Sequence, residues 1–136
     1  MKVLLVEDDL DQAISIEEYL ETEGIAVSHY LDFAGAKASL SNGTYDLIIC
    51  DLELGEASAA DEVPNLIDKY QIPLIMISGV SGTSDRIELL NLGACDFLQK
   101  PFDPAELVAR IRANLRIQSR PNVEKGAIWI LSLIHI

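Results

Sequence analysis

The chain has 136 residues, which fits one domain, and a domain of this size buries about two thirds of the surface of its unfolded chain. Hydrophobic residues make up 49% of the sequence, which argues against disorder throughout. The 22 acidic residues outnumber the 10 lysines and arginines and give a net charge of −12, which argues against direct binding of nucleic acid or of an anionic membrane surface.

The two cysteines, Cys50 and Cys95, lie in apolar surroundings and lack the CxxC spacing. We expect core or near-core thiols in a reducing compartment. No apolar run reaches the roughly 20 residues of a membrane helix, and the amino terminus enters a strand-like segment without a signal peptide. These features predict a soluble, cytoplasmic protein.

The first part of the chain alternates strand-like and helix-like segments. Strands are predicted over residues 3–6, 25–30 and 47–50, and helices over about 9–23 and 32–40. Asp9 or Asp11 and Asp32 stand where helix caps are expected, with Gly24 and Gly43 at the helix ends. In the first helix, the inward-facing stripe is predicted to consist of Leu10, Ala13, Ile14 and Leu20.

The stretch from residue 52 to 70 is harder to interpret. Gly55 and the small residues 57–60 suggest a loop, and Pro64 lies inside the helix that follows. Proline is well tolerated only in the first turn of a helix, so this helix is expected either to begin near Val63 or to be distorted there.

The remaining elements follow the same alternation. Strands are predicted over 73–77 and 97–99, and a helix over about 85–92 with Ser84 as its cap and Gly93 as its stop. The last helix begins at Asp103-Pro104, a cap followed by proline, and continues to about residue 115. Its inward-facing residues are expected to be Leu107, Val108, Ile111 and Leu115.

The carboxyl-terminal end differs in character from the rest. Residues 119–126 indicate a polar linker, and residues 127–136 are almost entirely apolar. We interpret 1–118 as the domain, and 119–136 as a linker and tail that is either the start of a truncated output segment or a non-native extension.

The alternation predicts an α/β fold, with helices on both faces of a parallel sheet. In such sheets ligands bind outside the carboxyl ends of the strands. Glu7-Asp8, Asp51, Ser78 and Lys100 each follow or end one predicted strand, so we expect them to share one cleft.

These groups suit a hard divalent cation together with a phosphoryl group. Mg²⁺ prefers oxygen ligands and usually takes one or two carboxylates, which Asp8 and Asp51 would supply, with Glu7 acting through a water. Asp51 would attack a phosphoryl donor and form an aspartyl phosphate, while Lys100 and Ser78 contact the phosphoryl oxygens. Taken singly, each residue has a plainer role as a cap, turn or solvated surface group.

Four motifs stand out within residues 1 to about 118: Leu4 to Asp9, Asp46 to Leu52, Pro73 to Ser78 and Lys100 to Phe102. In their order and spacing they resemble the receiver domain of two-component response regulators. The resemblance implies a five-stranded, doubly wound parallel sheet of the flavodoxin-like type and a cis peptide between Lys100 and Pro101.

The resemblance also implies roles for single residues. Asp51 would accept the phosphoryl group from a histidine kinase or phosphotransfer protein, and Mg²⁺ would be the cofactor. Asp8 would bind Mg²⁺ directly, and Glu53 would contribute its backbone carbonyl. Ser78 and Phe97 would form the conformational switch. Enzymatic activity would be limited to self-catalysed phosphoryl transfer and autodephosphorylation.

A further part of the resemblance concerns the surface. Arg86, Asp96, Glu106 and Arg110 match positions that form intersubunit ion pairs in regulators with winged-helix output domains. The implied homodimer uses the fourth helix, the fifth strand and the fifth helix. Solvated surface charge is the alternative interpretation, and an exposed ion pair contributes only about 0–1 kcal/mol.

Two other functions remain open from the sequence. A phosphatase of the haloacid dehalogenase type also uses an aspartate nucleophile and Mg²⁺, but it has an Asp two residues after the nucleophile, where Glu53 stands here. A receiver-like binding module that never uses a phosphate is the third hypothesis.

Overall fold

The computed structural model describes the chain except for residues 54–58, 80–86, 88–89 and 119–136. The strands are β1 (Lys2–Val6), β2 (Ala26–Tyr30), β3 (Leu47–Asp51), β4 (Leu74–Ser78) and β5 (Asp96–Gln99). The helices are α1 (Leu10–Thr22), α2 (Phe33–Asn42), α3 (Ala59–Tyr70) and α5 (Pro104–Gln118). The predicted helix over 85–92, the loop over 79–84 beyond Gly79 and the tail lie largely or wholly outside the described residues.

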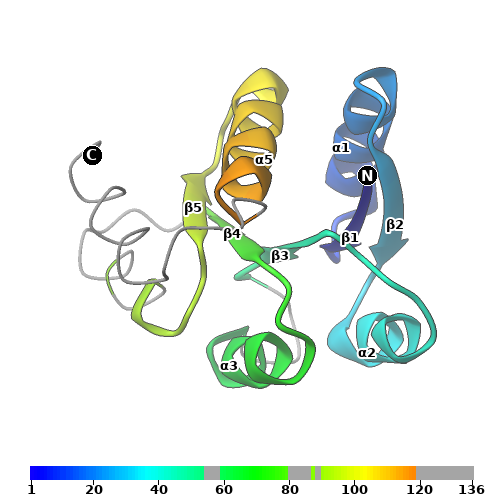
Figure 1. Cartoon of the computed structure of the whole chain (residues 1–136). Coiled ribbons are helices and arrows are strands. Elements are labelled where there is room, and N and C mark those ends of the chain that lie inside the picture. The colour runs from blue at the N-terminus through cyan, green and yellow to red at the C-terminus, as the bar shows by residue number, and fades with distance from the viewer. Residues whose placement is uncertain (54–58, 80–86, 88–89, 119–136) are drawn as a thin grey trace.

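The five strands form one parallel sheet in the order β2-β1-β3-β4-β5. Figure 1 shows α1 and α5 on one face of this sheet and α2 and α3 on the other. The predicted fold class, a doubly wound five-stranded sheet of the flavodoxin-like type, is therefore confirmed. The strand order reverses between β1 and β3, and this switch point is where ligands bind in such folds.

Two hydrophobic clusters hold the layers together, one on each face of the sheet. Alternate residues of β3 enter opposite clusters: Leu47 and Ile49 face α1 and α5, whereas Ile48 and Cys50 face α2 and α3. Because both faces are covered, all five residues of β3 are buried. This burial explains why the strand is a continuous apolar run up to its last residue, Asp51.

Helix α1 begins as predicted but turns a different face to the sheet. The Asp9 side chain caps it by accepting a hydrogen bond from the backbone N–H of Gln12 at 3.2 Å. The prediction that Leu10 and Ile14 face inward is wrong, because they are 57% and 50% exposed. Ala13, Ile16 and Leu20 are the buried residues of this helix.

Helices α2 and α3 complete the opposite layer. Asp32 caps α2 as expected, with its Oδ1 accepting from the N–H of Gly35 at 2.8 Å. Helix α3 begins at Ala59, so the first of the two predicted alternatives, a start near Val63, is wrong, as is a loop that includes residues 59 and 60. Pro64 lies within the helix. Burial of Val63 and Leu66 in the cluster on this face stabilises the helix and offsets the free-energy cost of the backbone hydrogen bond that proline cannot donate.

The last elements agree with the sequence-based prediction. Gly93 adopts a φ of +110°, a conformation that favours glycine, ahead of β5. The peptide between Lys100 and Pro101 is cis, as the resemblance implied. Asp103 caps α5 by accepting from the N–H of Ala105 at 2.9 Å, and Leu107, Val108 and Ile111 are buried, with Leu115 partly buried against them.

The expected position of both cysteines in or near the core is confirmed. Cys50 is buried and Cys95 is partly buried, and both thiols are free. Burial raises the pKa of both thiols, that of Cys95 to about 12, so neither cysteine is a reactive thiolate at neutral pH. Among the described residues, no helix is both long and apolar enough to cross a bilayer.

Candidate functional site

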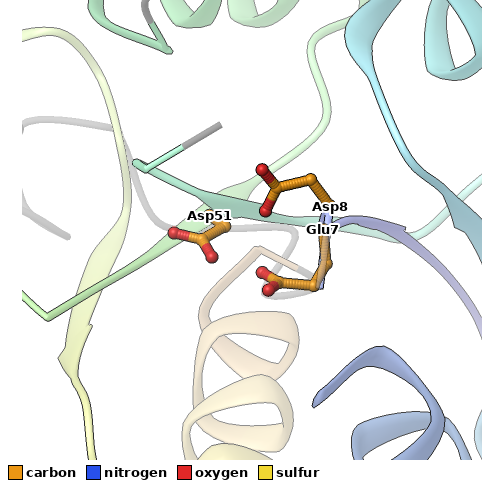
Figure 2. Close-up of side chains that lie close together, drawn as sticks. All are labelled: Glu7, Asp8 and Asp51. Atoms are coloured by element: carbon orange, nitrogen blue, oxygen red, sulfur yellow. The ribbon is translucent and has the colours of Figure 1, made fainter. Parts of the chain in front are cut away.

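Three carboxylates meet at the carboxyl edge of the sheet, at the β1/β3 switch point. Glu7 and Asp8 directly follow β1, and Asp51 is the last residue of β3. Figure 2 shows the three side chains turned toward one another, and one oxygen of each lies within 4.8 Å of the others. The sequence predicted this convergence from the strand ends, and the structure brings these residues together.

The cluster is partly buried and is contacted by Lys100. Glu7 and Asp51 are each 2% exposed, whereas Asp8 is exposed to solvent. The Nζ of Lys100 lies 2.6 Å from Oδ2 of Asp51 and 4.0 Å from Oε1 of Glu7. The lysine follows β5, so its side chain crosses the end of β4 to reach the end of β3. The predicted pairing of Lys100 with this cleft is thus present.

Crowding of the carboxylates separates their pKa values. Burial, a hydrogen bond to Asp51 and the charge of Asp51 raise the pKa of Glu7 from 4.5 to about 8. Burial also opposes ionisation of Asp51, but hydrogen bonds from Glu7, Lys100 and the backbone N–H of Glu53 outweigh it and lower the pKa of Asp51. At neutral pH Glu7 is therefore the protonated member of the pair and Asp51 the ionised one.

The donor set fits a divalent metal ion. All three groups are carboxylates, and hard cations such as Mg²⁺ select oxygen ligands of this kind. Their mutual approach within 4.8 Å suits one ion bound between them. The exposure of Asp8 leaves one side of the cluster open to water, which Mg²⁺ usually retains as ligands.

The other predicted site residues lie on the neighbouring strands. Ser78 ends β4 and is fully buried, and Phe97 on β5 is 8% exposed, with its side chain in the cluster that faces α2 and α3. The backbone N–H of Glu53 donates to Oδ1 of Asp51 at 2.9 Å. The Glu53 carboxylate itself lies against β4, with Oε1 at 3.4 Å from Oγ of Ser78 and 3.0 Å from the backbone nitrogen of Gly79.

Sequence reasoning missed two of these contacts. Only the backbone carbonyl of Glu53 was predicted to act in the site, not its side chain. The imidazole Nε2 of His29 lies 2.6 Å from the backbone carbonyl oxygen of Glu7 and was not singled out at all. The signal for His29 was available in principle, because β2 pairs with β1 and brings His29 level with Leu5, two residues before Glu7.

The candidate dimer residues assemble within one chain. Arg110 on α5 contacts Asp96 at 2.7 Å and Glu106 at 3.1 Å, and Asn114 donates to Asp96 at 3.1 Å. Arg86, the fourth residue of the predicted set, lies outside the described residues. The contacts among the other three are consistent with a charged surface in a single chain and do not test a dimer.

The pKa of Glu7 predicts a pH-dependent stability of the metal-free protein. Between pH 4.5 and about 8 the folded chain keeps the Glu7 proton that the unfolded chain has lost, so stability falls as pH rises through this window. In Glu7→Gln this contribution is absent. The free energy of unfolding of the variant should therefore rise relative to that of the parent by on the order of 1 kcal/mol for each pH unit within the window. Urea denaturation in the presence of a chelator measures both curves.

The difference between parent and variant isolates Glu7 from other groups that titrate in the same range. Glu18→Gln removes one charge from the exposed surface of α1 and serves as the control, which should follow the parent. A Glu7→Gln curve parallel to that of the parent would contradict the raised pKa.

With this geometry established, comparison with known proteins identifies the family. Residues 3–112 match the family described as the response regulator receiver domain. The chain is 42% identical over 125 residues to the regulatory protein VirG of Agrobacterium tumefaciens, covering 91% of this chain and 46% of that protein. It is 41% identical over 123 residues to the response regulator ArlR of Staphylococcus saprophyticus, covering 90% of this chain and 56% of that protein.

Solved structures agree with this assignment. The receiver domain of the Francisella response regulator 1452 superposes with a TM-score of 0.81 at 28% identity, covering 87% of this chain and 98% of that one. The chain spans about half the length of the curated relatives that it matches. A haloacid dehalogenase, the alternative enzyme class, is set aside by the family match. The chain belongs to the family of response regulator receiver domains.

Proposed function

We propose that the chain is a phosphorylation-operated switch in which Asp51 accepts a phosphoryl group from a phosphohistidine of a kinase or phosphotransfer protein. The observation that carries the proposal is the contact of Asp51 with Lys100 at 2.6 Å, beside Glu7 and Asp8, at the carboxyl edge of the sheet. The lowered pKa of Asp51 keeps it ionised, and therefore nucleophilic, at neutral pH.

In the proposed reaction, an oxygen of Asp51 forms a bond to phosphorus while the phosphorus–nitrogen bond of the donor breaks. The electron pair of that bond leaves with the imidazole. The N–H of Glu53 orients Asp51 through Oδ1, and the Lys100 ammonium stabilises charge on the phosphoryl oxygens, joined by the Ser78 hydroxyl. The reaction is stoichiometric, followed by self-catalysed hydrolysis of the aspartyl phosphate.

Mg²⁺ is the proposed cofactor. Asp8 and Asp51 would bind it directly, Glu7 through a water, and Glu53 through its backbone carbonyl. When bound, the ion would neutralise charge shared by these carboxylates and by the incoming phosphoryl group. The cluster of three carboxylates supports this assignment by its chemistry, since oxygen ligands suit Mg²⁺.

Ser78 and Phe97 are the proposed switch residues. Modification of Asp51 would draw the Ser78 hydroxyl toward the phosphoryl group and change the space open to the Phe97 ring. Phe97 is level with Met76 in the register of β4 and β5, two residues before Ser78, which supports a coupling between the two positions. The response would be a population shift between two conformers.

The output and the partners extend the proposal further. A relative from Klebsiella pneumoniae, CpxR, is described as a transcriptional regulatory protein, which supports a role in transcription for a longer protein that contains this domain. The proposed phosphoryl donor is a histidine kinase or phosphotransfer protein, and the proposed location is the cytoplasm. A homodimer would form through the face that carries Asp96, Glu106 and Arg110. The domain itself would make no direct contact with nucleic acid.

The labelling of the parent protein tests the function. With Mg²⁺ and acetyl phosphate, intact-mass measurement should show the gain of one phosphate, labile at alkaline pH and mapped to Asp51. Mg²⁺ alone should raise the melting temperature, because it binds only the folded site. A protein that neither gains phosphate nor responds to Mg²⁺ would instead be a phosphate-independent binding module.

A further inference from the structure

The carboxylate of Glu53 fills a small cradle of hydrogen-bond donors at the end of β4. Its Oε1 accepts from the backbone N–H of Gly79 at 3.0 Å and from the Ser78 hydroxyl at 3.4 Å. The fit is close, since a Cβ atom added to Gly79 would lie 3.2 Å from the same oxygen. One carboxylate oxygen of Glu53 thus accepts hydrogen bonds from two adjacent donors, the Ser78 hydroxyl and the Gly79 N–H.

The same donors lie where a group attached to Asp51 would need them. Asp51 is level with Ile77 in the register of β3 and β4, so Ser78 and Gly79 come next along the neighbouring strand. Glu53 also donates its own N–H to Asp51, which places its backbone beside the carboxylate that would be modified. An anion carried by Asp51 and the Glu53 side chain would therefore compete for the Ser78 and Gly79 donors.

We propose that the Glu53 carboxylate is an internal competitor of the phosphoryl group, held in the Ser78–Gly79 cradle before modification and displaced by it. This inference rests on the proposed phosphorylation of Asp51. Glu53 is exposed, so its side chain can move into water without any change of the backbone. It acts as a positioning residue that holds the Ser78 hydroxyl away from Asp51 until an anion replaces it.

Two substitutions at Glu53 separate the effect of its charge from the effect of its hydrogen-bond acceptor. Glu53→Ala removes both the charge and the acceptor, whereas Glu53→Gln keeps an oxygen that can accept from Gly79 but removes the charge. Both retain the backbone N–H that donates to Asp51 and the backbone carbonyl. Hydrogen bonds to charged groups are the stronger ones, so the affinity for an anion should rise from parent to Gln to Ala.

Beryllofluoride is a suitable probe, because it activates the receiver domain of Klebsiella pneumoniae RstA, which is 27% identical to this chain with a TM-score of 0.80. We expect Glu53→Ala to bind beryllofluoride with Mg²⁺ on the order of five- to tenfold more tightly than the parent, with Glu53→Gln between them. The rate of labelling by acetyl phosphate should rise in the same order. Titration calorimetry and intact-mass time courses measure the two quantities.

The matched control is Glu21→Ala, which removes one exposed carboxylate from the last turn of α1, the end of that helix away from the site. It should leave both quantities at the parent level. An equal gain in Glu21→Ala would assign the effect to net charge and overturn the inference, as would a Glu53→Ala variant that binds no more tightly than the parent.

If neither the parent nor any variant binds beryllofluoride or gains phosphate, the proposed function fails and the inference fails with it. If the parent is labelled at Asp51 and Glu53→Ala is not faster, only the inference fails.

Discussion

Asp51→Asn should lower phosphate incorporation from acetyl phosphate by on the order of a hundredfold or more, in the presence of Mg²⁺. The amide has nearly the shape of the carboxylate, and its one oxygen can keep the hydrogen bond from either Lys100 or the N–H of Glu53, so the fold should persist although one of the two bonds is lost. It lacks the anionic oxygen that attacks phosphorus. Intact-mass spectrometry measures the incorporation, and circular dichroism checks the fold.

Asp9→Asn is the matched control for this experiment. It removes one carboxylate two residues from Glu7, yet Asp9 is outside the cluster of three carboxylates and its role is to cap α1. Asparagine caps a helix about as well as aspartate, so this variant should be labelled like the parent. Equal labelling of Asp51→Asn and the parent would show that phosphate is added elsewhere and would remove Asp51 from its proposed role.

The convergence of the site could be predicted because it depends on topology more than on side-chain detail. Apolar runs such as Leu47–Cys50 mark strands that are buried on both faces, and the polar residue after each run marks the carboxyl edge. In a parallel sheet every such residue falls at the same edge. Asp8, Asp51 and Lys100 could therefore be assigned to one cleft before any coordinate was known.

The Glu53 side chain shows where this reasoning stops. Its backbone position follows from that of Asp51, two residues earlier, but a glutamate has several rotatable bonds that the sequence does not determine. The contact with Gly79 depends on the absence of a side chain there, which leaves room for the carboxylate. A contact of this kind is a tertiary feature, and no local pattern indicates it.

The orientation of α1 was mispredicted for a related reason. The sequence contains one possible apolar stripe made of Leu10, Ala13, Ile14 and Leu20. In the structure, the stripe that packs against the sheet includes Ile16 instead of Leu10 and Ile14. In a helix of 3.6 residues per turn, Ile14 points about 100° away from Ala13, enough to leave the buried face. Ile14 is exposed as a result, and only the packing against the sheet decides between the two stripes.

Ile16→Ala should therefore destabilise the protein by about 2–5 kcal/mol, because the side chain is 4% exposed and belongs to the cluster between α1, α5 and the sheet. Ile14→Ala makes the same chemical change two residues earlier in the same helix. Ile14 is 50% exposed, so this variant should stay within about 0.5 kcal/mol of the parent. Urea denaturation at one pH and one Mg²⁺ concentration measures both free energies of unfolding.

The pair is informative because helix propensity cancels between the two variants: alanine replaces isoleucine in each, and it favours the helix by a similar amount. The difference that remains reports burial alone. A larger loss for Ile14→Ala than for Ile16→Ala would mean that α1 is rotated about its axis relative to the structure. Such a rotation would turn Leu10 and Ile14 into the sheet, and it would alter the start of the helix at Asp9, directly beside the carboxylates of Glu7 and Asp8.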